Sequence, residues 1–173
     1  GSDGGSSPGA GRYGVGDTCA LKLLLTNEQV GSIIGKRGAV ITEMQETTRC
    51  RIKISPSHSY FPGTTERPAL LTGTTHAVGA ALDLILMRLY ADERERSADG
   101  MVARLAVKML IPESAAGLVI GKGGENVRAI TSDSGAAVKL SHKGDVATGV
   151  NERVVVVTGS DAQAIHAARL VFG

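Results

Sequence analysis

The sequence predicts an α+β protein built from two copies of one β-α-α-β-β-α unit. The tetrapeptide Gly-Lys-Arg-Gly at 35–38 returns as Gly-Lys-Gly-Gly at 121–124, an offset of 121 − 35 = 86 residues. Around each tetrapeptide, apolar runs of strand length alternate with apolar stripes at helical spacing. The same offset, with no gap, relates further pairs: Lys22 and Lys108, Leu24 and Leu110, Gly31 and Gly117, Ile34 and Ile120, Lys53 and Lys139, Ser55 and Ser141, Gly63 and Gly149, Glu66-Arg67 and Glu152-Arg153, and Thr72-Gly73 and Thr158-Gly159.

The first half of each copy is predicted to be a strand followed by two helices. The strand covers Ala20–Leu25 in the first copy and Leu105–Ile111 in the second, because both are short apolar runs. A short helix follows, whose apolar positions share one face and which ends at the first glycine of the tetrapeptide. We expect the second helix to end at Arg49 in the first copy and at Gly135 in the second.

The second half of each copy is predicted to be two strands and a long helix. Apolar and polar side chains alternate over 51–55 and again over 138–141, which is the period of a half-buried strand. A loop rich in Pro, Gly, Ser and Thr follows. The remaining predicted elements are the strand Ala69–Thr72 with the helix Thr75–Tyr90, and the strand Val154–Thr158 with the helix Asp161–Phe172.

We expect two domains, at residues 18–90 and 101–173. Residues 91–100 between them are few and highly charged, so they form either a solvated extension of the preceding helix or a linker. Residues 1–17 are rich in Gly and Ser and carry no apolar period, which predicts a flexible leader. The opening Gly1-Ser2 is typical of a scar left by tag removal, and we interpret the chain as a fragment of a longer protein.

The composition excludes several classes of function. The chain has 173 residues, a net charge of +2, three Tyr, two Phe and no Trp. Its apolar runs are far shorter than the ~20 residues of a membrane span. So small a charge excludes a mainly electrostatic duplex binder, and so few aromatic residues exclude the base-stacking platforms of RRM and OB-type domains. Two cysteines and four scattered histidines show no metal-ligand spacing and no catalytic set, so we expect no metal and no enzymatic activity.

The Gly-Lys-x-Gly tetrapeptide places a tight turn between two helices. Glycine has no Cβ, so the backbone of the turn can touch a ligand. Free amides at the start of the following helix and the helix dipole favour an anion there, and Lys36, Arg37 or Lys122 adds positive charge. A Walker A loop would need four residues between its first glycine and Gly-Lys, whereas three separate Gly31 from Gly35. The turn therefore suits a sugar-phosphate backbone.

The residues around both turns resemble type I KH domains, especially those of the Nova splicing regulators and the poly(C)-binding proteins. The resemblance covers about residues 18–172. It implies three helices packed on one face of a three-stranded antiparallel sheet, in agreement with the predicted order of elements. The matching segments are Val30–Gly38, Ile41, Arg51–Ser55 and Phe61–Arg67 in the first copy, and Ile111–Gly124, Lys139–Ser141 and Glu152–Val155 in the second.

The resemblance implies a narrow groove for about four unpaired nucleotides in each copy. The turn would contact the RNA backbone while an aliphatic floor receives the bases. The implied contact residues of the first copy are Asn27, Gly31, Ser32, Ile34, Gly35, Lys36, Arg37, Gly38, Ile41, Arg51, Ile52, Lys53, Ile54 and Arg67. Those of the second copy are Glu113, Gly117, Leu118, Ile120, Gly121, Lys122, Gly123, Gly124, Val127, Val138, Lys139, Leu140 and Arg153.

Two kinds of group would read the bases. The second strand of each copy lies at a sheet edge in this family, and unpaired N–H and C=O groups there can pair with a base. Arg67 and Arg153 match the arginine that reads the central cytosine through two parallel hydrogen bonds. The alternative for each is a surface Glu-Arg pair at the start of a strand.

The copies differ at positions that would set specificity. Arg51 matches an arginine that contacts cytosine in poly(C)-binding domains, where the second copy has Ala137. Glu113 matches an acidic residue that accepts from the cytosine amino group in Nova-like domains, where the first copy has Asn27. We therefore expect a stronger cytosine preference at the third core position in the first copy and a YCAY-like preference in the second.

The sequence thus predicts a non-enzymatic, cofactor-free protein that binds single-stranded, pyrimidine-rich RNA with YCAY- or CC-like cores. Its expected process is mRNA processing, such as splicing regulation, stability or translation, in the nucleus or the cytoplasm. Two alternatives stay open. One is C-rich single-stranded DNA, because the aliphatic groove does not itself require a 2′-hydroxyl. The other is a protein-interaction or dimerisation scaffold, with contact between domains or between copies through the sheet or the long helices.

Overall fold

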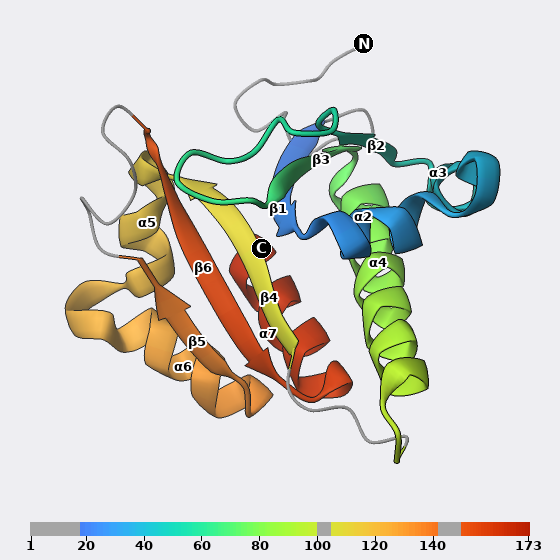
Figure 1. Cartoon of the computed structure of the whole chain (residues 1–173). Coiled ribbons are helices and arrows are strands. Elements are labelled where there is room, and N and C mark those ends of the chain that lie inside the picture. The colour runs from blue at the N-terminus through green and yellow to red at the C-terminus, as the bar shows by residue number, and fades with distance from the viewer. Residues whose placement is uncertain (1–17, 100–104, 142–149) are drawn as a thin grey trace, which may run out of the picture.

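The computed structural model describes residues 18–99, 105–141 and 150–173 (Figure 1). The predicted α+β fold is confirmed, because these residues follow the β-α-α-β-β-α order twice. The first repeat contains β1 (Cys19–Leu25), α2 (Asn27–Ile34), η2 (Lys36–Gly38), α3 (Ala39–Thr48), β2 (Arg51–Ile54), β3 (Arg67–Gly73) and α4 (Thr75–Arg96). The second contains β4 (Leu105–Pro112), α5 (Glu113–Ile120), η3 (Lys122–Gly124), α6 (Glu125–Ser134), β5 (Ala137–Leu140), β6 (Glu152–Gly159) and α7 (Asp161–Phe172).

The first helix of each repeat begins at a residue that is fixed by hydrogen bonds in the first turn of the helix. The hydroxyl of Thr26 accepts from the N–H of Gln29, and the Gln29 side chain accepts in return from the N–H of Thr26, which makes a capping box for α2. Helix α5 has no side-chain cap, and the N–H of Glu113 instead donates to the carbonyl of Asn151 at 2.8 Å. Because each helix starts at a fixed residue, the turn that follows it is also fixed.

The three strands of each repeat join into one six-stranded antiparallel sheet, in the order β2-β3-β1-β4-β6-β5. The join is the pair of β1 with β4, in which Leu23 lies opposite Met109. Met109 is the residue 86 positions after Leu23, so the repeats meet at equivalent residues and are related by an approximate twofold axis. The KH resemblance implied a three-stranded sheet for each repeat, and no local pattern in the sequence signalled this join.

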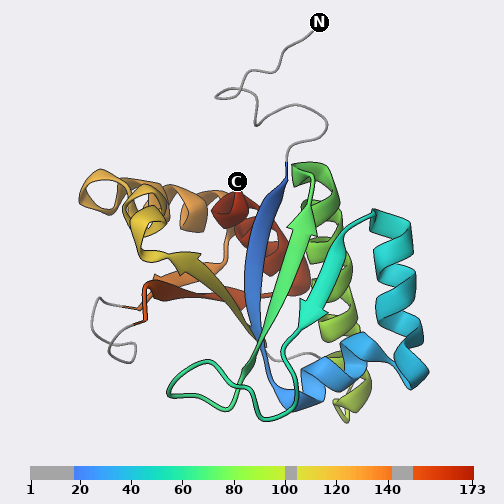
Figure 2. The ribbon, with the colours of Figure 1, turned by 90° about the horizontal axis from the view of Figure 1, so that it is seen from above.

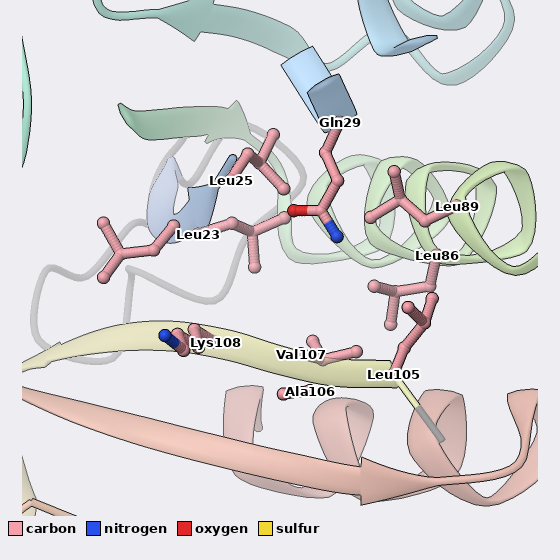
Figure 3. Close-up of a pocket in the computed structure, with 10 residues that line it drawn as sticks. Leu23, Leu25, Gln29, Leu86, Leu89, Leu105, Ala106, Val107 and Lys108 are labelled. Carbon is pink, nitrogen blue, oxygen red and sulfur yellow. The ribbon is translucent and has the colours of Figure 1, made fainter. Parts of the chain in front are cut away.

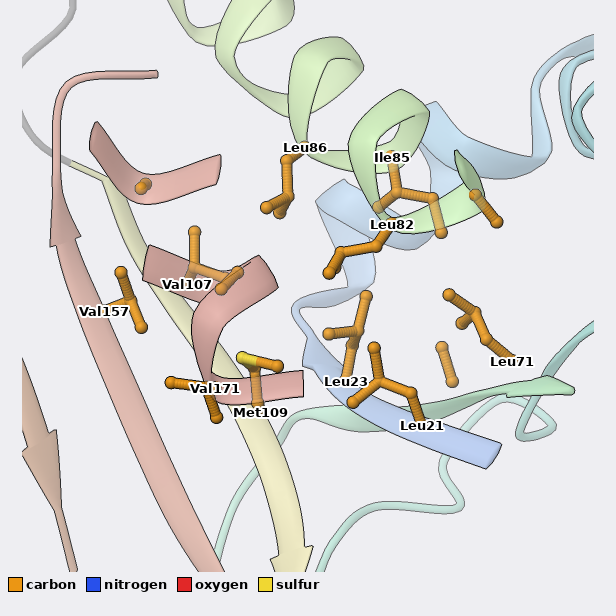
Figure 4. Close-up of a cluster of buried hydrophobic side chains, with 14 of the residues drawn as sticks. Leu21, Leu23, Leu71, Leu82, Ile85, Leu86, Val107, Met109, Val157 and Val171 are labelled. Carbon is orange, nitrogen blue, oxygen red and sulfur yellow. The ribbon is translucent and has the colours of Figure 1, made fainter. Parts of the chain in front are cut away.

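The helices of both repeats pack on one face of the sheet and share one hydrophobic core. Figure 4 shows Leu23 and Leu86 of the first repeat in the same cluster as Val107 and Met109 of the second. Leu23, Leu86 and Met109 are at most 1% exposed. Burial of a side chain of this size stabilises a protein by about 1.5–3 kcal/mol. The two repeats therefore contribute to each other's stability.

Helix α4 continues beyond Tyr90 into the charged segment and ends at Arg96. Its last turns contact α2, where a guanidinium nitrogen of Arg96 lies 3.6 Å from a carboxylate oxygen of Glu28. Residues 91–96 are thus a helix extension, one of the two forms expected for this segment. The domain limits at 18–90 and 101–173 stay predictions, and the predicted leader at 1–17 lies outside the described residues.

The contact between the repeats, called the seam below, comprises β1 with β4 and α4 with α7 (Figure 2). The hydroxyl of Tyr90 on α4 donates to the carbonyl of Gly159 at 2.8 Å, and burial raises the pKa of Tyr90 to about 12. A guanidinium nitrogen of Arg169 on α7 lies 3.6 Å from a carboxylate oxygen of Asp83 on α4.

Figure 3 shows a cavity at the seam between Gln29 and β4, and its volume of about 10 Å³ leaves room for about one water. The seam is therefore a packed interface.

Candidate nucleic-acid interface

Each Gly-x-x-Gly tetrapeptide forms the predicted tight turn between two helices. Gly35 and Gly121 are the C-cap residues of α2 and α5, with φ of 74° and 76°. A Cβ at Gly35 would overlap the side chain of Val40, and a Cβ at Gly121 would lie 2.6 Å from the backbone nitrogen of Asn126. Glycine alone suits both the left-handed conformation and the space, so the two helices of each repeat can approach closely at the turn.

The turns present positive charge and free amides to solvent. Lys36, Arg37 and Lys122 are exposed. Helices α3 and α6 begin after Gly38 and Gly124, and no side chain caps either N-terminus. The orphan amides of the first turn and the positive end of the helix dipole favour an anion beside these cationic side chains. The geometry can therefore hold a phosphate at each turn.

The predicted floor divides into accessible and buried residues. Ile52 and Val138 are only 6% and 8% exposed and belong to the core, so the bases could reach little of them. Gly31 and Gly117 are exposed, and a Cβ at either would meet no atom within 4 Å, so the helix surface stays low beside the floor. The partly exposed floor consists of Ile34, Ile41 and Ile54 in the first repeat, and of Ile120, Val127 and Leu140 in the second.

The outer strands β2 and β5 bring backbone groups to the floor. In the first repeat the N–H of Ser55 donates to the carbonyl of Pro68 at 3.0 Å. Because the inward and outward groups of an antiparallel strand alternate, Ile54 turns its N–H and C=O to the open edge. Such edge groups can pair with a base, as the resemblance implies. The second repeat has the same arrangement at Ser141, Val154 and Leu140.

Arg67 of the first repeat lies beside this edge, held by neutral acceptors. Its Nε and Nη2 donate to the carbonyl of Ser55 at 3.2 and 2.7 Å, and its Nη1 donates to Oδ1 of Asn27 at 3.3 Å. The carbonyl of Ser55 is available because Pro68 across the ladder has no N–H to donate. The Nδ2 of Asn27 donates to the hydroxyl of Tyr60 at 3.1 Å, which adds a residue of the loop to the group.

Arg153 of the second repeat has an anionic partner. Its Nη1 donates to the carbonyl of Ser141 at 2.7 Å, and its Nε donates to a carboxylate oxygen of Glu113 at 3.1 Å. The Arg153 side chain is 14% exposed. The structure thus brings together two predicted site residues of this repeat, but each is the other's partner. The alternative pairs with the neighbouring glutamates do not form, because Glu66 and Glu152 pair with lysines of the opposite repeat.

Several other predicted contact residues lie away from the aliphatic floor. Arg51 and Lys53, and Lys139 in β5, are exposed and alternate with the inward-facing residues, so they lie on the sheet face away from the helices. The hydroxyl of Ser32 donates to Asp92 of α4. Leu118, its equivalent in the second repeat, is 79% exposed. Contact of these side chains with RNA stays a prediction.

Sequence reasoning missed three residues that organise this region. Gln45 on α3 accepts from the N–H of Ile52 at 2.8 Å and so ties α3 to the edge strand, whereas Thr131 stands at the equivalent position. The hydroxyl of Tyr60 accepts from the side chain of Asn27, a contact that the sequence did not predict. Lys108 binds Glu66 across the seam. A lysine and a glutamate recur at equivalent positions of both repeats, but this recurrence does not indicate which lysine pairs with which glutamate.

Two further features are absent from the described part of the chain, a metal-binding cluster and a membrane-spanning helix. Within residues 18–99, 105–141 and 150–173, no cluster of three or more His, Cys, Asp or Glu could hold a metal ion. In the same ranges, no helix is both long enough and apolar enough to cross a membrane. Burial raises the pKa of the Cys50 thiol to about 11, so it stays protonated at neutral pH.

The fold defines a tandem of modules, each with a Gly-x-x-Gly turn between two helices and an open strand edge. The family model described as "KH domain" matches residues 20–87 and 106–172. The chain therefore belongs to the KH domain family, a class of modules that recognises single-stranded RNA.

Two relatives match over most of the chain and confirm the resemblance to the Nova family. The chain is 38% identical over 162 residues to RNA-binding protein Nova-2 of Homo sapiens, and this match covers 86% of the chain and 32% of Nova-2. It is 34% identical over 161 residues to RNA-binding protein Pasilla of Drosophila melanogaster, which covers 89% of the chain and 20% of Pasilla. The chain thus spans only a third or less of these relatives. The solved structure of Dim2p from Pyrococcus horikoshii OT3 matches with 20% identity and a TM-score of 0.33 over 89% of each chain.

Proposed function

We propose that the chain is a non-enzymatic tandem reader of single-stranded, pyrimidine-rich RNA that acts in mRNA processing, such as splicing, stability or translation. Such a role would be carried out in the nucleus or the cytoplasm. The observation that carries the proposal is the same three-part arrangement in both repeats: an uncapped helix start behind a glycine turn, a partly exposed aliphatic floor and an open strand edge. The names of the two RNA-binding relatives support the same class of ligand.

Each part of the groove has a chemical task in this proposal. Amides at the start of α3 or α6 and the charge of Lys36 or Lys122 bind phosphates. Bases lie flat on the aliphatic floor, which excludes a duplex because paired bases cannot be splayed onto it. Arg67 or Arg153 donates to the O2 and N3 acceptors of a cytosine, and strand-edge groups read a neighbouring base.

The grooves differ in the base they favour. In the first, Arg67 has only neutral partners, and the exposed Arg51 of the edge strand matches an arginine that contacts cytosine in poly(C)-binding domains, which supports a CC-like core. The second has Glu113, whose carboxylate can accept from a cytosine amino group while Arg153 donates to the same base, and Ala137 replaces the second arginine. This supports a YCAY-like core for the second repeat.

The sheet sets how one RNA could occupy both grooves. All five strand pairings are antiparallel, so the outer strands β2 and β5 run in opposite directions at opposite edges. Five strand spacings of about 4.8 Å put about 24 Å between them. One RNA must therefore reverse direction between two four-nucleotide cores and needs a spacer. Once one core is bound, the other binds at high effective concentration.

Charge reversal at the turns tests the proposal. The variants are K36D/R37D, K122D/G123D and all four changes together. Aspartate tolerates the left-handed backbone of positions 37 and 123, and a Cβ at Gly123 meets no atom within 4 Å. We expect either pair to lower the affinity for a two-core RNA by about 10²-fold or more, because bivalent binding is lost, and the quadruple variant to abolish binding. RNA affinity that survived in a folded quadruple variant would disprove the groove assignment.

The ligand class and the groove preferences need separate measurements. Two-core RNAs with spacers of increasing length should bind weakly when the spacer is short and best at an intermediate length. Matching DNA strands decide between RNA and C-rich single-stranded DNA. With one turn reversed at a time, UCAC and UCCC oligonucleotides report each remaining groove, and equal preferences in both would contradict the assigned difference.

A further inference from the structure

The loop between β2 and β3, residues 55–66, contacts the first groove at one end and the seam at the other. It is called the variable loop below. Figure 1 shows it leaving the outer strand β2 and extending across β1 toward β4 of the second repeat. The loop therefore lies where the two repeats could influence the same groove.

One end of the variable loop belongs to the groove. The carbonyl of Ser55 accepts from Arg67, and the hydroxyl of Tyr60 accepts from the side chain of Asn27, which in turn accepts from Arg67. These contacts set the place of the arginine that we assign to cytosine. A movement of Tyr60 would release Asn27, and with it one of the partners that orient Arg67.

The other end of the variable loop is held by the second repeat. Phe61 is 4% exposed and packs with Leu24 of β1 and Leu110 of β4 in a small apolar cluster separate from the main core. Both carboxylate oxygens of Glu66 lie 3.0 Å from Nζ of Lys108 on β4. Two strand residues of the second repeat thus hold two loop residues of the first.

The held residues close a small hydrogen-bonded turn. The N–H of Phe61 donates to the carbonyl of Glu66 at 2.8 Å, and the N–H of Thr64 donates to the carbonyl of Phe61 at 3.0 Å. The hydroxyl of Thr64 also accepts from the N–H of Glu66 at 3.0 Å. Because Tyr60 immediately precedes this closed turn, its position depends on where the second repeat holds Phe61 and Glu66.

We propose that the second repeat is a positioning element for the first groove, acting through Lys108 on Glu66 and through Leu110 on Phe61. This inference rests on the proposed function and adds to it two residues that lie in neither groove. Lys22 provides a matched control for Lys108. Lys22, the twofold equivalent of Lys108, pairs with Glu152 at 2.9 Å across the same seam and is 43% exposed, but holds no residue of the variable loop. By sequence, Ala147 stands where the second repeat would need an equivalent of Phe61.

The test compares K108A with K22A in a full chain whose second turn carries K122D/G123D. Each variant loses one positive charge and one ion pair across the seam. A four-nucleotide UCCC RNA fills a single groove, so its Kd reports the first groove alone. We expect K108A to weaken binding about threefold to fivefold, because the RNA must then order the loop, and K22A to leave the Kd unchanged. The exchange E66K/K108E, which keeps the pair with its charges reversed, should restore the affinity.

A second readout separates positioning from a general loss of stability. Amide hydrogen exchange of residues 59–66 should accelerate in K108A and not in K22A, while thermal unfolding shifts equally in both. Equal Kd changes in K108A and K22A, or no change in either, would overturn the inference and leave the proposed function intact. If the parent chain with its intact first turn does not bind the RNA at all, the proposed function fails together with the inference.

Discussion

The two repeats share one backbone plan and one seam, but they hold their central arginines in different ways. Arg67 rests on a carbonyl and on the neutral amide of Asn27, whereas Arg153 is bound by the carboxylate of Glu113. A charge-assisted contact therefore holds Arg153 more strongly than a neutral contact holds Arg67. The comparison teaches that one position, Asn27 or Glu113, can change which contact the arginine must give up when it binds a base, without any change in fold.

A second contrast lies between the seam and the grooves. Equivalent residues meet at the seam, as with Leu23 and Met109, while the grooves diverge at several positions. The surfaces of the seam are thus related by near-twofold symmetry, whereas the surfaces of the two proposed grooves are not. The inner strands β1 and β4 and the long helices α4 and α7 thus contact each other within one chain. Dimerisation of two chains stays a prediction.

The largest expected effect concerns the shared core. L23A and M109A remove equivalent side chains from the centre of the seam, and each should lower the free energy of unfolding by about 2–5 kcal/mol. Because the core is continuous, denaturant unfolding should remain one transition that moves as a whole. M87A, at a side chain that is 55% exposed, is the control and should change stability by less than about 0.5 kcal/mol. Two separate transitions, only one of them shifted, would show that the repeats fold independently.

The turns offer the next comparison. G121A and G35A both force a Cβ into a left-handed conformation, and each should cost about 2–4 kcal/mol in denaturant unfolding. We expect losses of similar size, because the Cβ in G35A meets the β-branched Val40 and the Cβ in G121A meets the backbone nitrogen of Asn126, and neither can move aside easily. G38A, whose Cβ meets no atom within 4 Å and whose backbone is in the milder αL region, is the control for a positive φ without a clash and should cost less. Equal losses in all three variants would mean that the close approach of the helices contributes nothing.

Exchanging the partners of the two arginines should exchange the groove preferences. N27E gives Arg67 a carboxylate, and E113N gives Arg153 a neutral amide. With the opposite turn reversed in each case, the ratio of UCAC to UCCC affinity should move toward that of the other repeat by about threefold to tenfold. Oligonucleotide titrations measure both ratios. Unchanged ratios would assign the difference to Arg51 and Ala137 instead.

The smallest expected effect is a pH dependence at the seam. Burial raises the pKa of Tyr90 to about 12 from the ordinary 10, so the folded state favours the neutral phenol. Its contribution is complete below pH 10 and is lost as the pH rises toward 12. Y90F removes the hydrogen bond to Gly159 and should cost about 1 kcal/mol at pH 7. The stability difference between wild type and Y90F should then shrink between pH 10 and 12, and a constant difference would contradict the assigned burial.

Much of each repeat could be predicted because its signals are local. The apolar periods and the glycine turn predicted all the described strands and α-helices, and the limits of α7 agree with the expected Asp161–Phe172. Strand β3 begins at Arg67, two residues before the expected Ala69. Pro68 lies within the strand, although a proline usually marks a strand boundary. Here the missing N–H is tolerated, since the Arg67 side chain donates to the Ser55 carbonyl in its place.

The sequence by itself determined the repeat, its elements and the two turns, because caps, glycines and apolar periods act between residues close in the chain. The tertiary structure alone decided that β1 and β4 would join the two sheets, that Ile52 and Val138 would lie in the core, and that Lys108 would hold the variable loop of the other repeat. Contacts between the repeats join residues as much as 130 positions apart in the chain, as Lys22 and Glu152 are. They depend on how two finished units pack, which no local pattern encodes.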